Sequence, residues 1–305
     1  MKKIILTILL ISSMSYSAFY DTGIGARPIG LGGAFVGVAD DANAMYYNIA
    51  GISQIKEITF TATYSNYFLG IKDNYMAVVC PFQKYGTIGV SWLNMAANLY
   101  NENTFTLGYS YPLDRNSYLG IGVKMLLKSF GNDELSALNP VFSKTTASGF
   151  AVDISLYSKL TDDISVGASF ENLNQPDVSL SSKDTVPSIY RAGAKYKLFK
   201  SLFLTAEGDY RNSEIKGAIG SEYSVDVKFL ETLGIKDSNI SFRGGFGYGT
   251  NNYSNLSLGF SFFLPTKYVD GRLDYSFTLP FNFIDGMTTH RFTINIMEPK
   301  PEFNI

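Results

Sequence analysis

The chain is poor in the residues on which many active sites depend. Its 305 residues include one cysteine, Cys80, and one histidine, His290. A single cysteine provides neither a disulfide framework nor a cysteine-ligated metal site. Charged residues make up only 17% of the chain, and the 25 basic side chains do not outnumber the 27 acidic ones, so nothing in the sequence favours nucleic acid as a partner. We expect no metal, no cofactor and no nucleic-acid partner.

Long apolar runs are also missing. Residues 4–11 are apolar except for Thr7, follow Lys2 and Lys3, and precede small residues up to Ser17. This is the arrangement of a secretory signal peptide over residues 1–17, with cleavage expected after Ser17. The run is shorter than the roughly 20 apolar residues that a membrane-spanning helix needs, and no other segment approaches that length. If the mature chain lies in a membrane, it must cross it with strands.

Aromatic residues and glycine are abundant. The sequence contains 21 Tyr, 23 Phe and 28 Gly. Strands that are rich in aromatics and poor in charge suit a sheet with one face toward lipid and its ends at the headgroups. A soluble β-sandwich is the alternative for the same composition.

Alternation with a period of two runs through most of the chain. In residues 56–64, 103–111 and 269–279, large apolar residues occupy every second position and Thr, Ser, Gly or charged residues lie between them. Such runs predict an all-β transmembrane antiparallel barrel of about 14 strands over residues 56–297, followed by a tail at 298–305; an even number of strands of about ten residues is typical of single-chain bacterial barrels. The expected strands are residues 56–64, 73–82, 85–95, 103–112, 117–128, 147–159, 162–172, 188–198, 201–211, 215–225, 239–248, 254–264, 268–279 and 288–297.

The connections alternate in length, as they do in barrels with short inner turns and longer outer loops. Residues 131–146, 173–187 and 280–287 become outer loops when both chain ends lie on the inner side. The connection at 226–238 is the exception, because it is long and yet falls on the inner side. Either a strand boundary differs there or the chain carries a small inner insertion.

The segment at 18–55, before the first strand, is predicted to be a hatch or plug inserted in the lumen. Its glycines let backbone approach backbone closely or bend sharply. Asp40 and Asp41 are typical of the start of a short helix, expected through residues 42–47, and so short a helix is stable only when it is packed. A dinucleotide-binding loop is excluded, since the third glycine of that motif is missing and no strand precedes it. The candidate hatch residues are Gly30, Gly32, Gly33, Asp40, Asp41, Asn48 and Ala50.

Charged residues recur in the inward phase of the later strands. A charge facing lipid would cost several kcal/mol near mid-membrane, roughly 2–4 for Arg or Lys, so these side chains must point into the lumen. Two interpretations stay open: a structural ion-pair network that positions the plug, and a charged ring that guides an anionic headgroup. The residues are Arg191, Lys195, Glu207, Asp209, Lys216, Glu222, Arg243, Arg272, Asp274 and Arg291.

Several stretches together resemble one family of outer-membrane proteins. They are residues 25–51, residues 167–173 with their Asn172-Leu173 ending, Pro187 with residues 190–193, and residues 273–277 with 289–292. They resemble the FadL-like outer-membrane β-barrel superfamily and, within it, the PorV/PorQ branch. In fatty-acid transporters of this superfamily an Asn-Pro-Ala motif belongs to the hatch. It corresponds to Asn48-Ile49-Ala50 here, with Ile49 in place of the proline.

The resemblance implies location in the bacterial outer membrane, with its lipids as surroundings, and leaves three functions open. The first is passive transport of hydrophobic small molecules such as long-chain fatty acids, with the hatch as gate. The second is a PorV/PorQ-like component of a type IX-like protein secretion system, which does not transport small molecules and whose partner is a secreted protein or the secretion complex. The third, an outer-membrane lipid hydrolase, would require His290 to be catalytic. That residue is better explained as a headgroup-level or structural side chain, so we expect no enzyme.

Overall fold

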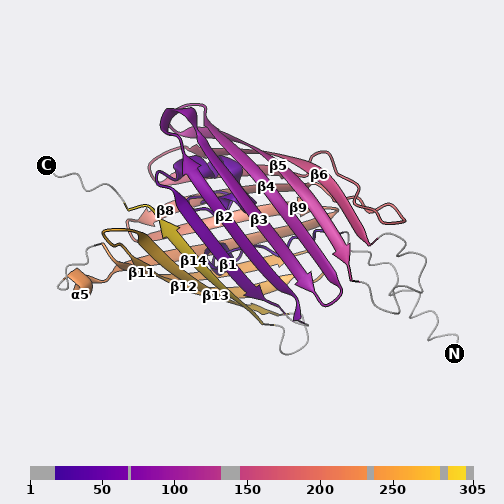
Figure 1. Cartoon of the computed structure of the whole chain (residues 1–305). Coiled ribbons are helices and arrows are strands. Elements are labelled where there is room, and N and C mark those ends of the chain that lie inside the picture. The colour runs from indigo at the N-terminus through magenta and orange to yellow at the C-terminus, as the bar shows by residue number, and fades with distance from the viewer. Residues whose placement is uncertain (1–17, 68–69, 132–144, 232–236, 282–287, 300–305) are drawn as a thin grey trace.

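The computed structural model describes residues 18–67, 70–131, 145–231, 237–281 and 288–299, so the predicted signal peptide at 1–17 and most of the tail at 298–305 lie outside the described residues. In the described part, fourteen antiparallel strands close into a barrel, because β1 pairs with both β2 and β14 (Figure 1). This confirms the predicted fold class and number of strands. The strands are β1 (Thr59–Asn66), β2 (Lys72–Pro81), β3 (Thr87–Ala97), β4 (Tyr100–Pro112), β5 (Ser117–Phe130), β6 (Thr146–Lys159), β7 (Ile164–Glu171), β8 (Ile189–Phe199), β9 (Leu202–Arg211), β10 (Glu214–Asp226), β11 (Asn239–Gly249), β12 (Ser254–Leu264), β13 (Asp270–Pro280) and β14 (Thr289–Met297).

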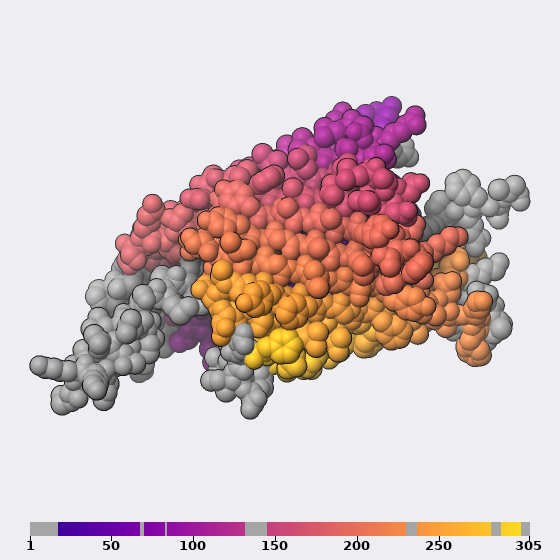
Figure 2. Space-filling view, turned by 180° about the vertical axis from the view of Figure 1, so that it is seen from behind, coloured from indigo at the N-terminus to yellow at the C-terminus, as the bar shows by residue number. Residues whose placement is uncertain are grey.

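The two faces of the wall differ as the alternation predicts. In β4, Thr106 and Ser110 are buried toward the lumen, whereas Phe105 and Leu107, on either side of Thr106, are 46% and 57% exposed. Successive side chains of a strand point to opposite faces, and the outward positions carry the large apolar residues all round the barrel. Figure 2 shows part of this outer surface from behind, from coral to orange, where β8 to β12 lie side by side.

We call the end at which β1 begins and β14 ends the inner end, and the opposite end the outer end. The long inner connection between β10 and β11 contains a short helix, α5 (Lys228–Glu231), which explains its length as an insertion. A short 3-10 turn, η3 (Gln83–Tyr85), lies between β2 and β3. At the outer end β7 and β8 are joined by a long loop, while most of the predicted loops 131–146 and 280–287 falls outside the described residues.

The segment before β1 lies within the ring of strands, where its indigo ribbon is visible behind β2 and β3 (Figure 1). It contains α2 (Ala26–Gly30), α3 (Ala44–Tyr47) and a 3-10 helix, η1 (Ile49–Gln54). The structure therefore starts the predicted helix two residues later than residue 42 and adds α2, which the sequence did not indicate. Helices of four to six residues are unstable alone. They persist here because they pack on the wall, α2 against β11 to β14 and η1 against β3 to β6.

The apolar core of the molecule is formed largely by this segment. One cluster joins Ala42, Met45 and Ile52 to Tyr75 and Val79 of β2, and another joins Leu31, Phe35 and Val36 to Tyr47. All these residues are nearly or fully inaccessible to solvent. In the described part of the chain, no helix is long and apolar enough to cross a membrane.

Candidate functional site

The segment at 18–55, which we call the plug from its place inside the barrel, lies against glycines at several inward positions of the wall. A Cβ atom added at Gly245 of β11 would lie 2.0 Å from the amide nitrogen of Gly32, and one at Gly220 of β10 would lie 2.4 Å from the carbonyl oxygen of Leu31. Farther round the wall, a Cβ at Gly167 of β7 would lie 2.1 Å from the carbonyl oxygen of Val36. Real Cβ atoms do not approach this closely, so only glycine leaves room for the plug backbone.

Polar side chains of the wall bind the plug backbone directly. One Glu207 carboxylate oxygen accepts the amide hydrogens of both Phe35 and Val36, at 2.7 Å each. The Ser165 hydroxyl donates to the carbonyl of Gly37 at 2.8 Å, and Thr293 accepts the amide hydrogen of Ala26 at 2.9 Å. These bonds satisfy backbone groups that are buried outside regular secondary structure. The plug is therefore attached to β7, β9 and β14, on several sides of the barrel.

Asn48 connects the plug to itself and to the wall. Its side-chain nitrogen donates to the carbonyls of Val36 and Leu156, both at 3.0 Å, and its oxygen accepts the amide hydrogen of Ala50 at 3.1 Å, which caps η1. Ala50 also donates to the Ser155 hydroxyl of β6 at 2.9 Å. The turn that a proline would constrain is thus held by the Asn48 side chain.

Arg27 of α2 is the centre of a first group of buried ion pairs, which we call the Arg27 cluster. It pairs with Asp40, with Asp41 at 3.0 Å and with Glu222 of β10 at 2.8 Å. Arg272 of β13 approaches Asp41 to 2.6 Å. The remaining pairs join wall residues to one another or to Asp40, and the cluster consists of Arg27, Lys195, Asp40, Asp41, Glu222, Arg243, Arg272 and Asp274.

A second group, the Arg191 cluster, lies nearer the outer end. Arg191 of β8 binds Asp21 of the plug at 2.6 Å and Glu171 of β7 at 2.9 Å. Lys124 of β5 forms one ion pair with Glu171 at 2.8 Å and another with Asp153 of β6 at 2.7 Å. Five of these charged residues, Asp21, Arg27, Lys124, Asp153 and Glu171, are absent from the predicted set. Lys124, Asp153 and Glu171 lie at inward positions of β5, β6 and β7, so the alternation within these strands would have indicated them.

The plug carboxylates remain ionised over a wide pH range. Burial raises the pKa of Asp21, but the charges of Arg191 and Lys216 outweigh it and hold that pKa well below its ordinary value. For Asp40, burial is likewise outweighed by Arg27 and Lys195, and its pKa is lowered as well. A carboxylate with a depressed folded pKa stabilises the folded state above its unfolded pKa, near 4, and loses this contribution as pH falls through the lower folded value. The ion pairs of Asp21 and Asp40 should therefore keep their contribution from neutral pH down to about pH 4.

A cavity of about 490 Å³ lies between the plug and the outer ends of β10 and β12 to β14. Tyrosine rings line much of it, including Tyr20, Tyr67 and Tyr253. Charged side chains also line it: Arg191, Asp21 and Asp209, and two further cations. Of these two, Arg291 contacts the Tyr67 hydroxyl at 2.9 Å, and Lys216 contacts the Tyr20 hydroxyl at 3.1 Å. Within the described residues neither cation forms a salt bridge, and the Arg291 Nε, although buried, has no hydrogen-bond partner. We call this space the outer cavity.

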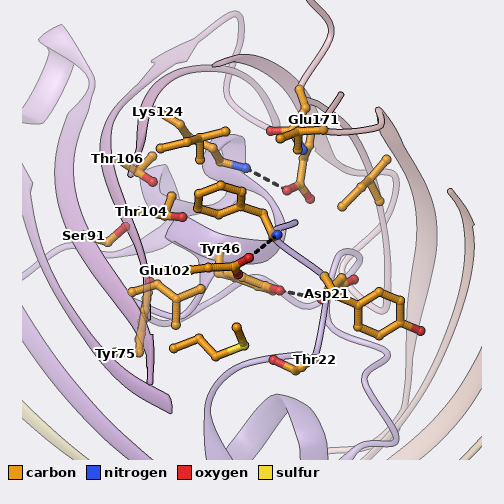
Figure 3. A pocket seen from close by; sticks show the side chains of 18 of the residues that line it. Asp21, Thr22, Tyr46, Tyr75, Ser91, Glu102, Thr104, Thr106, Lys124 and Glu171 are labelled. Carbon is orange, nitrogen blue, oxygen red and sulfur yellow. Dashed lines mark hydrogen bonds and ion pairs between the residues drawn. The ribbon is translucent and has the colours of Figure 1, made fainter. Parts of the chain in front are cut away.

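A smaller cavity, about 60 Å³, lies on the other side of the plug's first residues, against the inward side chains of β2 to β5 (Figure 3). Residues 20–22 line both cavities and so separate them. Hydrogen bonds hold this separating segment at both ends: Glu102 accepts the amide hydrogen of Phe19 at 2.7 Å, and Asp73 accepts the hydrogen of the Thr22 hydroxyl at 2.9 Å. In Figure 3, Glu102 and Tyr46 both point toward this segment.

All the predicted lumen charges point inward, and the structure divides them. Lys195, Glu222, Arg243, Arg272 and Asp274 join the Arg27 cluster, as the ion-pair interpretation expects. Arg191 forms its own cluster, with Asp209 at 4.0 Å, and Glu207 binds plug amides. Lys216 and Arg291 line the outer cavity, as Arg191 and Asp209 also do, and form no salt bridge within the described residues; the headgroup interpretation of these charges stays a prediction.

The candidate hatch residues are all inside the barrel. Gly30 lies against Arg243 and Gly259, and Gly33 lines the outer cavity with nothing within 4 Å of its added Cβ. Gly32, Asp40, Asp41, Asn48 and Ala50 make the contacts given above. These contacts hold the segment in place; a gating role stays a prediction.

His290 faces outward and has a structural environment. Its Nδ1 lies 2.7 Å from the hydroxyl of Tyr275, and its ring packs against Phe277. These contacts are those of an outward side chain within an aromatic group.

Comparison with known proteins gives matches in structure but not in sequence. No protein-family model matches the chain, and no curated protein matches its sequence. A FadL homologue of Pseudomonas aeruginosa matches with a TM-score of 0.63 at 10% identity, over 93% of this chain and 99% of that chain. The CymD monoaromatic hydrocarbon channel gives 0.62 at 11% identity, over 92% and 98%, and the Ralstonia pickettii toluene transporter TbuX gives 0.60 at 12%, over 91% and 98%. The chain therefore has the fold of the FadL-type barrels.

Proposed function

We propose that the protein is an outer-membrane channel for passive transport of hydrophobic small molecules. The observation that carries this is the outer cavity, a space of about 490 Å³ between the plug and the outer end of the barrel wall. Its volume falls in the range of small-molecule sites, roughly 300–1,000 Å³. The solved structures with this fold include hydrocarbon channels and a toluene transporter, which supports the same class of cargo.

The lining suggests that the cargo carries an acidic head. The aromatic walls suit an apolar body, while Arg291 and Lys216, neither of which forms a salt bridge within the described residues, offer positive charge beside the carboxylates of Asp21 and Asp209. Charged hydrogen bonds of this kind stabilise a carboxylate by about 1.5–3 kcal/mol each. A long-chain fatty acid meets both requirements. In this proposal the residues at 18–55 form the hatch, and the separating segment at 20–22 is the part that must move to join the two cavities.

Replacing Arg291 by glutamine tests this assignment. We expect the affinity for hexadecanoate to fall about tenfold or more, because the carboxylate loses a charged donor, while the affinity for the uncharged hexadecanol changes little. Displacement of a fluorescent apolar probe from the detergent-solubilised barrel would measure both. Lys197→Gln is the control, since Lys197 lies at the inner end, 3.9 Å from Asp163. Equal losses for the acid and the alcohol would contradict an acidic-head site.

Membrane placement has its own test at Leu107. This residue is 57% exposed on the outward face of β4, so Leu107→Arg should destabilise the barrel in bilayers by about 2–4 kcal/mol. Leu113→Arg is the control: it is 55% exposed as well but lies in the inner turn after β4, where the cost should be about 0–1 kcal/mol. Urea titration of folding into vesicles would measure the difference. Equal effects at both positions would contradict the placement of this barrel in a membrane.

A second candidate follows the PorV/PorQ resemblance, a barrel that serves a type IX-like secretion system without transporting small molecules. One observation favours it: the plug is bound on several sides by ion pairs and hydrogen bonds. Uptake of labelled hexadecanoate into vesicles separates the candidates. Uptake above that of protein-free vesicles supports the channel, whereas no uptake together with co-purification of a secreted protein supports the secretion component.

A further inference from the structure

The outward face of β2, β3 and β4 carries a polar patch that the channel does not use. Counting toward the outer end, the outward rows of these strands begin with Val78, Val90 and Leu107, followed by Met76, Trp92 and Phe105. The next row is Asn74, Asn94 and Asn103, directly opposite one another across the three strands. The outermost row is Lys72, Ala96 and Asn101. Apolar side chains thus give way to amides at the same height on all three strands.

The amides form one connected network, which we call the asparagine patch. Asn94 donates to Asn101 at 2.9 Å and to Asn103 at 3.2 Å, and Asn103 donates to Asn101 at 2.7 Å. Asn74 donates to Asn94 at 3.3 Å. The indole N–H of Trp92, in the row below, donates to Asn103 at 3.0 Å. The network holds the four amides in fixed positions on the outer wall.

The patch keeps hydrogen-bonding capacity for a ligand. Each amide has two N–H donors and an oxygen with two lone pairs, and the Asn101 nitrogen donates in none of the bonds just described. Lys72 is exposed beside the patch and forms no salt bridge within the described residues. Ala96, which has a short side chain, lies between Lys72 and Asn101 in the same row.

From this geometry we infer a binding site for an anionic glycolipid of the surrounding membrane. The sugar hydroxyls would bind the asparagine patch, a phosphate would bind Lys72, and the acyl chains would lie on the apolar rows of Met76, Trp92 and Phe105. The occupant is a lipid because the patch sits directly above that band, of which Met76 is 44% and Phe105 46% exposed, and such a band on the outer wall of a barrel faces acyl chains. An aromatic residue at this boundary is typical of a membrane interface. The inference rests on membrane placement but not on transport.

The test is lipid binding by the double variant Lys72→Ala/Asn101→Ala. Both side chains lie in the outermost row, so the bonds of Asn74, Asn94, Asn103 and Trp92 to one another remain. The purified full chain in detergent is titrated with lipid A, a phosphorylated disaccharide lipid, and bound lipid is counted by native mass spectrometry. We expect affinity for lipid A to fall about tenfold or more in the variant. Asn251→Ala, an exposed amide in the hairpin between β11 and β12, should bind like the unchanged protein.

Two further lipids identify what is recognised. Phosphatidylethanolamine, with a phosphate but no sugar, and an uncharged glycolipid should each bind more weakly than lipid A. Equal binding of lipid A to the protein and the double variant, while both resist SDS at room temperature, would overturn the site. So would equal binding of all three lipids, or a variant that loses a co-purifying protein and retains lipid A. Uptake of hexadecanoate should be unchanged in the variant, which separates this inference from the transport proposal.

Discussion

Replacing Gly245 by valine should turn the closed barrel into an ion-conducting pore. The new Cβ would lie 2.0 Å from the amide nitrogen of Gly32, and the valine methyls would occupy space held by the plug backbone. Overpacking typically costs about 1–3 kcal/mol, occasionally more, and backbone on both sides leaves little room for relaxation. The strand ladder needs no glycine here, so the wall should stay closed while the plug is displaced.

Planar-bilayer conductance measures this outcome, with resistance to SDS at room temperature as the check on the wall. Gly244→Val is the matched control, because Gly244 is the preceding residue, faces the opposite side, and has nothing within 4 Å of its added Cβ. It should remain at background conductance. If Gly245→Val also stays at background in an SDS-resistant barrel, the wall side chains themselves close the lumen, and the secretion candidate gains over the channel.

Replacing Arg27 by glutamine should unseat the plug through charge instead of volume. The change leaves Asp40, Asp41 and Glu222 buried without their shared cation. Removing one partner of a buried ion pair typically costs about 3–5 kcal/mol. We expect the plug to become sensitive to added protease at neutral pH while the strands remain protected. Mass spectrometry of the fragments would locate the cuts within residues 18–55.

The double variant Arg27→Gln/Glu222→Gln sharpens this result, because it neutralises a carboxylate that in the single variant has lost Arg27 and keeps only Arg243. Protection should return in part. An exposed pair gives the reference: Lys197→Gln should change protection hardly at all, since exposed pairs contribute about 0–1 kcal/mol. A plug that stays protected in the single variant would mean that hydrogen bonds such as those of Glu207 are sufficient to seat it.

The strands and their faces follow from local sequence. Phe105 and Leu107 alternate with Thr104 and Thr106, and this alternation alone assigns lipid and lumen sides, because successive side chains of a strand point in opposite directions. The inward placement of Arg191, Arg243 and Arg272 follows from the same phase together with the cost of charge in lipid. The short helix near Asp40 was also predictable in kind, although it begins two residues later than expected.

The partners of these groups are decided by the closed barrel. Arg27 and Glu222 are 195 residues apart in the chain, and no local pattern states that α2 meets β10. In the sequence, Gly245 is a residue type that weakens a strand. In the barrel, only glycine at this position leaves room for the backbone of Gly32. The sequence by itself determined how many strands form and which way each side chain points, since both depend on neighbours along the chain. Only the tertiary structure decided how the plug is held, where the outer cavity lies and which asparagines meet, because these depend on strand register and closure between residues distant in sequence.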